Sequence, residues 1–182
     1  FNAQVVMISQ YDPLTRRVYH HYAIENGEHL NINQWMPVDS SRATILRTRK
    51  PFMINLQEIL KAVDEKRMKV IPGTRLPKTW LGVPMLVGNT ALGVVSLQNL
   101  DVENAFSQAD INLLMTLTNS MTLSLENARL FSRNERLLHV LQAEMNLARN
   151  TQKSILPGRR PRKAGYDFGS LILPAHVVGG DF

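Results

Sequence analysis

Residues 106–157 read FSQADINLLMTLTNSMTLSLENARLFSRNERLLHVLQAEMNLARNTQKSILP, and this stretch decides how the rest of the chain is organised. Between Ser107 and Leu156 there is neither Pro nor Gly, and apolar residues recur at helical spacing throughout. The run predicts one unbroken helix, which would be about 75 Å long at 1.5 Å per residue. Because no small domain is that wide, we expect the final helix of a domain to continue as a stalk.

The start of this helix is well specified. Ser107 is a candidate N-cap with Asp110 as the acidic half of a capping box, and Phe106 and Ile111 are placed for a hydrophobic staple. The first half is apolar on most of its circumference, which predicts packing on more than one side.

The second half is less apolar and carries a seam at alternating spacings of three and four residues, with one polar interruption. Its members are Leu138, Leu141, Met145, Ala148 and Ile155. This spacing predicts a short coiled coil that pairs two copies of the chain. The alternative is a single amphipathic helix packed on its own domain.

The composition and charge of the chain exclude several kinds of site and partner. The 182 residues include no cysteine, which excludes disulfides, thiolate metal sites and thioether attachment of a chromophore, and suits a cytoplasmic location. The net charge is +6, but the basic residues are spread out, and the dense cluster at 159–163 lies in a Pro/Gly loop without interleaved aromatic residues. We expect no nucleic-acid partner, and no membrane partner because no apolar run reaches the length of a span.

Before the long helix, strand and helix patterns alternate. We expect strands at 3–12, 16–24, 51–55, 79–87 and 91–100, and helices at 40–49 and 56–70. Gly88, Asn89 and Thr90 join the last two strands as a hairpin. This order predicts an α+β fold, an antiparallel sheet with helices on both faces. Strict alternation in the second strand places His20 and His21 on opposite faces, where we interpret both as surface residues.

Residues 80–130 also resemble a known family. The hairpin pattern GVPxxVG…xxGVxSLQN and the FSxxD start of the closing helix are similar to the C-terminal half of a GAF domain. The resemblance implies a six-stranded antiparallel sheet, a ligand-sized cavity on one face, and dimerisation through terminal helices. It predicts a GAF domain at 1–131 without the family's N-terminal helix, and a helical linker at 132–156.

The C-terminal residues carry a second resemblance. ARNTQKSILP at 148–157 and PAHVVGGDF at 174–182 resemble the start of SpoIIE-like protein phosphatases, the metal-dependent (PPM-type) serine/threonine type. It implies that Asp181 is a ligand of catalytic Mg²⁺ or Mn²⁺, in a domain of which 157–182 is a truncated start. One carboxylate cannot hold two metals, so we expect no phosphatase activity from these residues. The alternatives are the GGDEF motif of diguanylate cyclases and an uninformative Gly-Gly turn.

These expectations combine into one hypothesis of function. The chain would be the sensory, regulatory GAF module of a bacterial signalling phosphatase, whose phosphoprotein substrate would be of the anti-sigma-factor antagonist type. Trp35, Phe52 and Trp80 are the candidates for lining a ligand pocket, although aromatic residues of a small domain are more often plain core. No GAF ligand can be named and no cofactor is expected in these residues. The alternative is a ligand-free dimerisation scaffold.

Overall fold

The computed structural model describes residues 1–68, 74–155 and 163–169. The chain divides into two compact units, Phe1–Glu126 and Asn127–Phe182, so that the boundary falls within the last helix. The elements, in order, are β1 (Val5–Asp12), β2 (Arg17–Glu25), β3 (Glu28–His29), β4 (Met36–Pro37), α1 (Ser40–Thr48), β5 (Phe52–Asn55), α2 (Leu56–Asp64), β6 (Thr79–Val87), β7 (Thr90–Asn99) and α3 (Gln108–Ile155).

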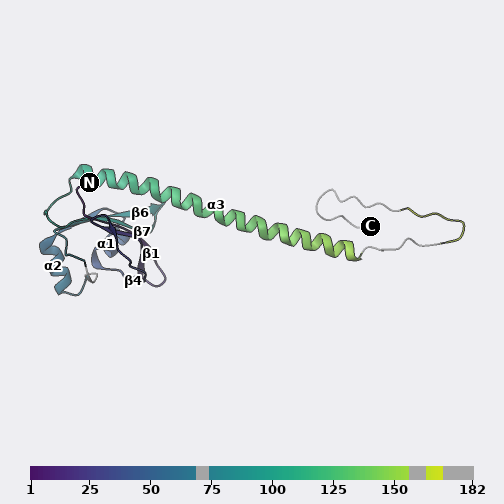
Figure 1. Cartoon of the computed structure of the whole chain (residues 1–182), viewed down its shortest axis with the longest axis horizontal. Coiled ribbons are helices and arrows are strands. Elements are labelled where there is room, and N and C mark those ends of the chain that lie inside the picture. Colours follow the sequence, from purple (N-terminus) through teal and green to yellow (C-terminus); the bar gives the residue numbers. More distant parts are fainter. Residues whose placement is uncertain (69–73, 156–162, 170–182) are drawn as a thin grey trace. The chain divides into compact units, whose positions relative to one another are not determined.

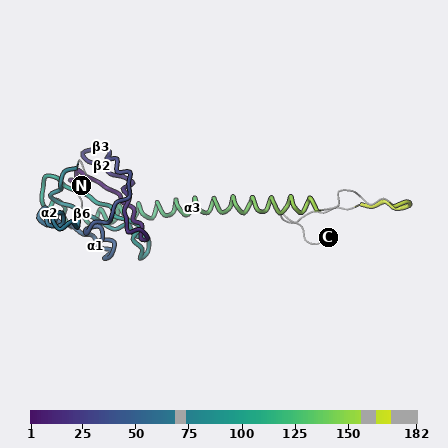
Figure 2. The backbone as a smooth tube through the Cα atoms, turned by 90° about the horizontal axis from the view of Figure 1, so that it is seen from below, coloured from purple at the N-terminus to yellow at the C-terminus, as the bar shows by residue number. Residues whose placement is uncertain are grey.

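The strands of the first unit form one antiparallel sheet in the order β3-β2-β1-β7-β6-β5, and β4 also pairs with β2. Figure 2 shows β2 and β3 at one margin of this unit and α2 at another. The predicted α+β class is confirmed. The sheet has seven described strands rather than six, because two dipeptide strands, β3 and β4, both pair with β2.

Helices cover both faces of this sheet (Figure 1). On one face, α3 contributes Leu114 to a core cluster with alternate residues of β6 and β7, among them Val83 and Leu97. On the other face, Ile45 of α1 and Ile59 of α2 are fully buried in a second cluster. Successive side chains of a strand point to opposite faces of the sheet, so each strand contributes alternate residues to both core clusters.

The β6–β7 hairpin forms where the sequence predicts it. Its turn contains two residues, Gly88 and Asn89, because Val87 pairs with Thr90. Gly88 has φ +56°, and its Cβ-less backbone accepts this left-handed conformation without strain. A glycine with positive φ at the first turn position is typical of tight hairpins.

α3 begins as predicted and is continuous over 48 residues. The Ser107 backbone N–H donates to the Asp110 carboxylate over 2.8 Å, and the Asp110 N–H donates to Ser107 Oγ over 3.3 Å, which completes the capping box. Phe106 is 4 % exposed, and Ile111 packs against the same core cluster. Within the described chain, no helix combines the length and apolarity that a membrane crossing requires.

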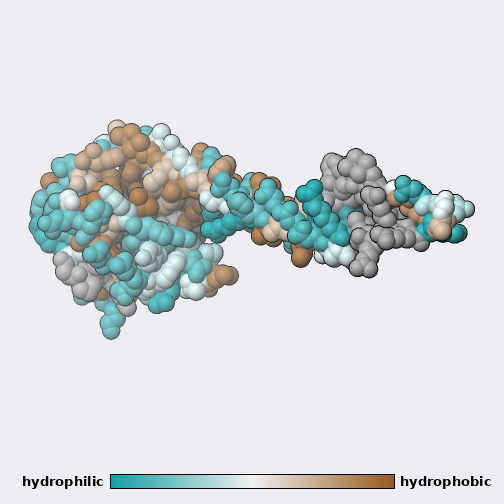
Figure 3. Space-filling view, turned by 45° about the vertical axis from the view of Figure 1, so that its right-hand side comes forward, coloured by the Kyte–Doolittle hydropathy of each residue, from teal (hydrophilic) through white to brown (hydrophobic). Residues whose placement is uncertain are grey.

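The packing of the first half of α3 differs from the prediction. Only Leu114, Thr118 and Thr122 are buried, and they lie four residues apart on one face. Threonine suits this face because Thr122 Oγ1 donates to the Thr118 carbonyl over 2.7 Å, which satisfies its hydroxyl. Four leucines of this half are each half-exposed or more: Leu113, Leu117, Leu123 and Leu125. Figure 3 shows apolar atoms gathered on the side of this unit where α3 begins.

α2 is shorter than predicted and ends at Asp64 rather than near Val70. Lys66 adopts a positive φ of 55°, and the N–H groups of Arg67 and Met68 both donate to the Ala62 carbonyl. These bonds satisfy the end of the helix and turn the chain back. Met68 still packs against the cluster that contains Ile59, which explains why its spacing resembles a continuing helix.

Candidate functional site

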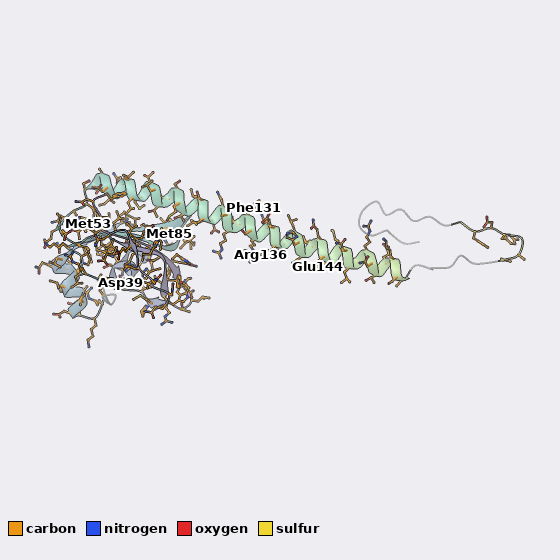
Figure 4. The ribbon with its side chains drawn as sticks, viewed as in Figure 1. Asp39, Met53, Met85, Phe131, Arg136 and Glu144 are labelled. Atoms are coloured by element: carbon orange, nitrogen blue, oxygen red, sulfur yellow. The ribbon has the colours of Figure 1, made fainter. Side chains whose placement is uncertain are left out.

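A polar cavity of about 100 Å³ lies on the sheet face that α1 covers. β2, β4, the start of α1 and the turn after α2 contribute to its wall. The lining residues are Val18, His20, Met36, Pro37, Val38, Asp39, Arg42, Lys66 and Arg67. Figure 4 shows Asp39 on the side of the sheet away from α3.

Asp39 has two roles in this wall. As the N-cap of α1, its carboxylate accepts the backbone N–H of Arg42 over 2.9 Å, which satisfies one of the free donors at the helix start. The same carboxylate forms an ion pair with the Arg42 guanidinium. The residue that begins α1 therefore also holds the arginine in place.

Arg42 is a buried cation, only 8 % exposed. Its Cζ lies 5.5 Å from the centroid of the Trp80 ring, which is a cation–π distance. A guanidinium tolerates such a site better than an ammonium group, because it is planar and more weakly hydrated. Asp39 and Trp80 together fix the position of its positive charge beside the cavity.

His20 is the second buried titratable group of the wall, 7 % exposed. Ser9 Oγ lies 2.8 Å from His20 Nδ1. Burial and, to a smaller extent, the charge of Arg42 lower the pKa of His20 to about 4, although the charge of Asp39 opposes the shift. The imidazole is therefore neutral at neutral pH.

The burial of His20 contradicts its interpretation as a surface residue. His20 lies two residues after the buried Val18 and so shares its covered face of the sheet. A β-bulge follows: Ile8 pairs with Tyr22 and Ser9 pairs with His20, so His21 is an extra residue in β2 and the next buried position is Ala23. His21 is exposed and bonds to the Gln10 side chain over 2.6 Å.

Ser9 and His20 resemble a nucleophile and its base, but their setting favours a structural role. Ser9 is fully buried in β1, and it is not among the residues that line the cavity. A histidine whose pKa is held near 4 is a weak base at neutral pH. The geometry supports binding in this cavity rather than catalysis.

The three aromatic residues predicted to line a pocket lie in two places. Trp80 is 3 % exposed in the core cluster of α1 and α2, and Phe52 packs against that cluster. Trp35 is 40 % exposed, and its ring centroid lies 5.5 Å from that of Tyr19. None of the three lines the cavity described above.

Sequence reasoning did not single out Arg42 or His20 as site residues. An arginine on a short helix normally lies at the surface, and the alternation of β2 does not by itself show which of its faces is covered. The usable signal was Asp39, three residues before Arg42 at a helix start, because this spacing allows both the cap and the ion pair.

The residues of the predicted coiled-coil seam lie on α3 in the second unit. Leu138, Leu141, Met145 and Ile155 are 58 %, 51 %, 51 % and 75 % exposed, and Ala148 is also exposed. Figure 4 shows other side chains, those of Phe131, Arg136 and Glu144, along the same helix. Asp181, the predicted metal ligand, lies outside the described residues. Among the residues that are described, no group of three potential ligands is placed to hold a metal ion.

Comparisons with known proteins agree on the first unit. A family model described as "GAF domain" matches residues 1–125. No curated protein has a matching sequence.

Several solved structures share the fold. The GAF domain of a two-component sensor histidine kinase from Bacillus halodurans is 19 % identical, with a TM-score of 0.55, and the match covers 72 % of this chain and 87 % of that one. The GAF domain of an Acinetobacter phosphoenolpyruvate-protein phosphotransferase is 18 % identical, with a TM-score of 0.54, covering 72 % and 75 %. Residues 122 to 287 of a methyl-accepting chemotaxis protein are 15 % identical, with a TM-score of 0.57, covering 71 % and 81 %.

Proposed function

Because the chain belongs to the GAF domain family, whose members are sensory and regulatory modules of signalling proteins, we propose a specific role for it. Its first unit receives a small-molecule signal in the cavity beside Arg42. α3 passes that signal to a metal-dependent serine/threonine phosphatase, in a cytoplasmic homodimer. The absence of cysteine suits that compartment.

The observation that carries this proposal is the apolar row on the second half of α3. Leu138, Leu141 and Met145 are each at least half-exposed, so the described chain does not cover them. Apolar residues at this spacing form a stable seam when a second helix supplies the facing holes. A homodimer supplies that helix with the same residues, and a change in helix pairing or rotation can then carry a signal between the units.

The test is the mass of the chain in solution, measured by light scattering. We expect a dimer, twice the 20.6 kDa of one chain. Leu141→Glu should shift the equilibrium towards monomer, because it places a carboxylate in the seam. Gln142→Glu is the matched control, since it adds the same charge one position away on the same helix. A wild-type monomer, or equal weakening by both variants, would remove the dimeric stalk from the proposal.

Support for the phosphatase comes from the sequence patterns at 148–157 and 174–182. Asp181 would be one ligand of a Mg²⁺ or Mn²⁺ site, and hard divalent ions prefer such carboxylate oxygens. The resemblance assigns only this one metal ligand to these 182 residues, and a two-metal site needs more, so the proposal places the activity in a longer protein that carries this chain. In that protein, Asp181→Asn should abolish Mn²⁺-dependent phosphate release from a phosphoserine protein of the anti-sigma-factor antagonist type. Undiminished release would exclude a metal ligand at this position.

A second candidate function is a dimerisation scaffold without a ligand. The small volume of the cavity, about 100 Å³, and the packing of Trp80 in the core favour it. The two functions differ in one measurement. A sensor gains about 2.7 kcal/mol of stability at a hundredfold excess of ligand over its dissociation constant, and a scaffold gains none.

A further inference from the structure

A second exposed face of α3 lies beside the seam of the proposed dimer. Its apolar members are between 48 % and 68 % exposed: Leu130, Leu137, Val140 and Leu147. Arg133 and Glu144 are also exposed and lie between them, so that the six residues follow one another at alternating steps of three and four. These steps keep residues on one side of a helix. We call the six residues the second face.

The second face is distinct from the seam. Four of its residues each come directly before a seam residue, as Leu137 precedes Leu138 and Val140 precedes Leu141. One residue turns an α-helix by about 100°, so the two faces lie about a quarter turn apart. A helix at the corner of a four-helix bundle meets its two neighbours at about this angle. A single partner helix that covers the seam therefore leaves the second face free.

The two charges of the second face have no counterpart on their own helix. Ion pairs along a helix join residues three or four positions apart. At those positions Glu144 has apolar residues alone: Val140, Leu141, Leu147 and Ala148. Arg133 has two leucines and two arginines there. Among the described residues, neither charge has an ion-pair partner. A partner that covers this face therefore needs a cation opposite Glu144 and an anion opposite Arg133.

A second copy that runs antiparallel supplies both charges. The six residues lie symmetrically about the midpoint between Leu138 and His139. A two-fold axis at that midpoint brings each residue against the one at the same distance on the other side, and the contact is reciprocal. The facing pairs, with one residue from each copy, are Leu130 with Leu147, Arg133 with Glu144, and Leu137 with Val140. Every apolar residue then meets an apolar one, and each charge meets its opposite.

The charges also decide the direction of the two helices. In a parallel pair each residue faces its own copy, which brings two Arg133 side chains together and two Glu144 side chains together. Like charges that face each other across an interface are unfavourable. The antiparallel pair turns the same four charges into two opposite-charge contacts. Exposed ion pairs add little affinity, so we expect a weak contact whose direction is well defined.

We propose that the second face joins two of the proposed dimers into a tetramer, through antiparallel contact of their stalks over residues 130–147. Each helix meets one neighbour through the seam and another through the second face. A four-helix bundle closes in this way when the helices that the seam pairs run parallel. The inference rests on the proposed function, since it takes the dimer as its unit, and it adds an assembly that depends on protein concentration.

Sedimentation equilibrium of the whole chain over a wide range of concentration is the first test. We expect a dimer in dilute solution and twice that mass in concentrated solution. Val140→Glu adds an unpaired carboxylate to the second face, so it should weaken the association of dimers by about tenfold or more while the dimer persists. Ala143→Glu is the matched control, because it adds the same charge at an exposed position that belongs to neither face.

Reversed charges test the pairing of Arg133 with Glu144. Arg133→Glu and Glu144→Arg should each weaken the tetramer by about tenfold or more, because each creates like-charge contacts. The double variant exchanges the two charges and should restore the tetramer. Arg136→Glu, at an exposed position outside the second face, is the control and should associate as the wild type does.

Disulfides report the direction of the helices, because the chain has no cysteine of its own. Chains that carry Leu137→Cys and chains that carry Val140→Cys are mixed, left to exchange and oxidised. The antiparallel contact brings these two positions together, so we expect the mixed disulfide to form in preference to either homodisulfide. His139→Cys, mixed with Val140→Cys in the same way, should give no preference for the mixed product.

The outcomes separate this inference from the proposed dimer. A mass that stays at the dimer at every concentration overturns the inference and leaves the dimer standing. A tetramer that Val140→Glu or a single charge reversal does not weaken also overturns it, as does a preference for the Leu137→Cys homodisulfide. A dimer that Val140→Glu abolishes and Leu141→Glu does not would remove the seam and retain the antiparallel contact. A monomer at every concentration removes both.

Discussion

His20 should make the first unit sensitive to mild acid. Its pKa is about 4 in the folded protein, against an ordinary value of 6.5, because burial and the charge of Arg42 oppose protonation. Between these two values the unfolded chain binds a proton at His20 and the folded protein does not. Stability therefore falls as the pH falls through this window, and is fully present above pH 6.5.

The size of the effect follows from the difference between the two pKa values. Each pKa unit corresponds to about 1.4 kcal/mol, so lowering the pH from 7 to 5 should cost about 2 kcal/mol of unfolding free energy through His20 alone. The cost should reach about 3 kcal/mol at pH 4. Other groups also titrate in this range, so the measurement must be a difference between variants.

The assay is urea unfolding followed by tryptophan fluorescence at pH 7, 6, 5 and 4. His20→Asn removes the titrating ring and retains a polar atom near Ser9, so its stability should depend less on pH than that of the wild type. His21→Asn is the matched control, because His21 is the neighbouring residue and is exposed. If the curves of wild type and His20→Asn stay parallel from pH 7 to 4, the assignment of the acid sensitivity to His20 is refuted.

Three further predictions concern stability, each measured by urea unfolding at pH 7. Ser107→Ala removes the cap of α3 and should cost about 1 kcal/mol; no loss would mean that the cap contributes nothing. Gly93→Ala places a Cβ 2.0 Å from the backbone oxygen of Ser9 and should cost more than about 3 kcal/mol, whereas Gly169→Ala, with open space around it, should be neutral. Ile45→Ala opens a cavity at a fully buried site and should cost about 2–5 kcal/mol; a loss below 1 kcal/mol would show that the core collapses around it.

The long helix and the β6–β7 hairpin could be predicted because local signals determine both. The absence of Pro and Gly, together with the reciprocal bonds of Ser107 and Asp110, specifies where α3 begins and that it continues. A glycine with positive φ in a two-residue turn specifies the hairpin. These signals do not depend on distant parts of the chain.

The cavity could not be predicted, since it depends on contacts between distant residues. Arg42 is buried because Trp80 lies beneath it and Met7 beside it, 38 and 35 positions away in the sequence. The predicted aromatic residues do not line the cavity: Trp80 packs in the core, while a cation and a neutral histidine line the space. Likewise, hydrophobic periodicity did not show that threonines form the buried face of α3.

The bulge in β2 also affects how this chain should be aligned with its relatives. If His21 is deleted, all the remaining residues of β2 keep their partners on β1, because Tyr22 would then follow His20 in a regular ladder. Position 21 is thus a natural place for a gap. Suppose that residues 17–25 are aligned without a gap to a relative that lacks the bulge. Residues on one side of His21 would then be matched to residues that point to the opposite face of the sheet. Such an alignment would assign the polar wall of the cavity to the wrong residues.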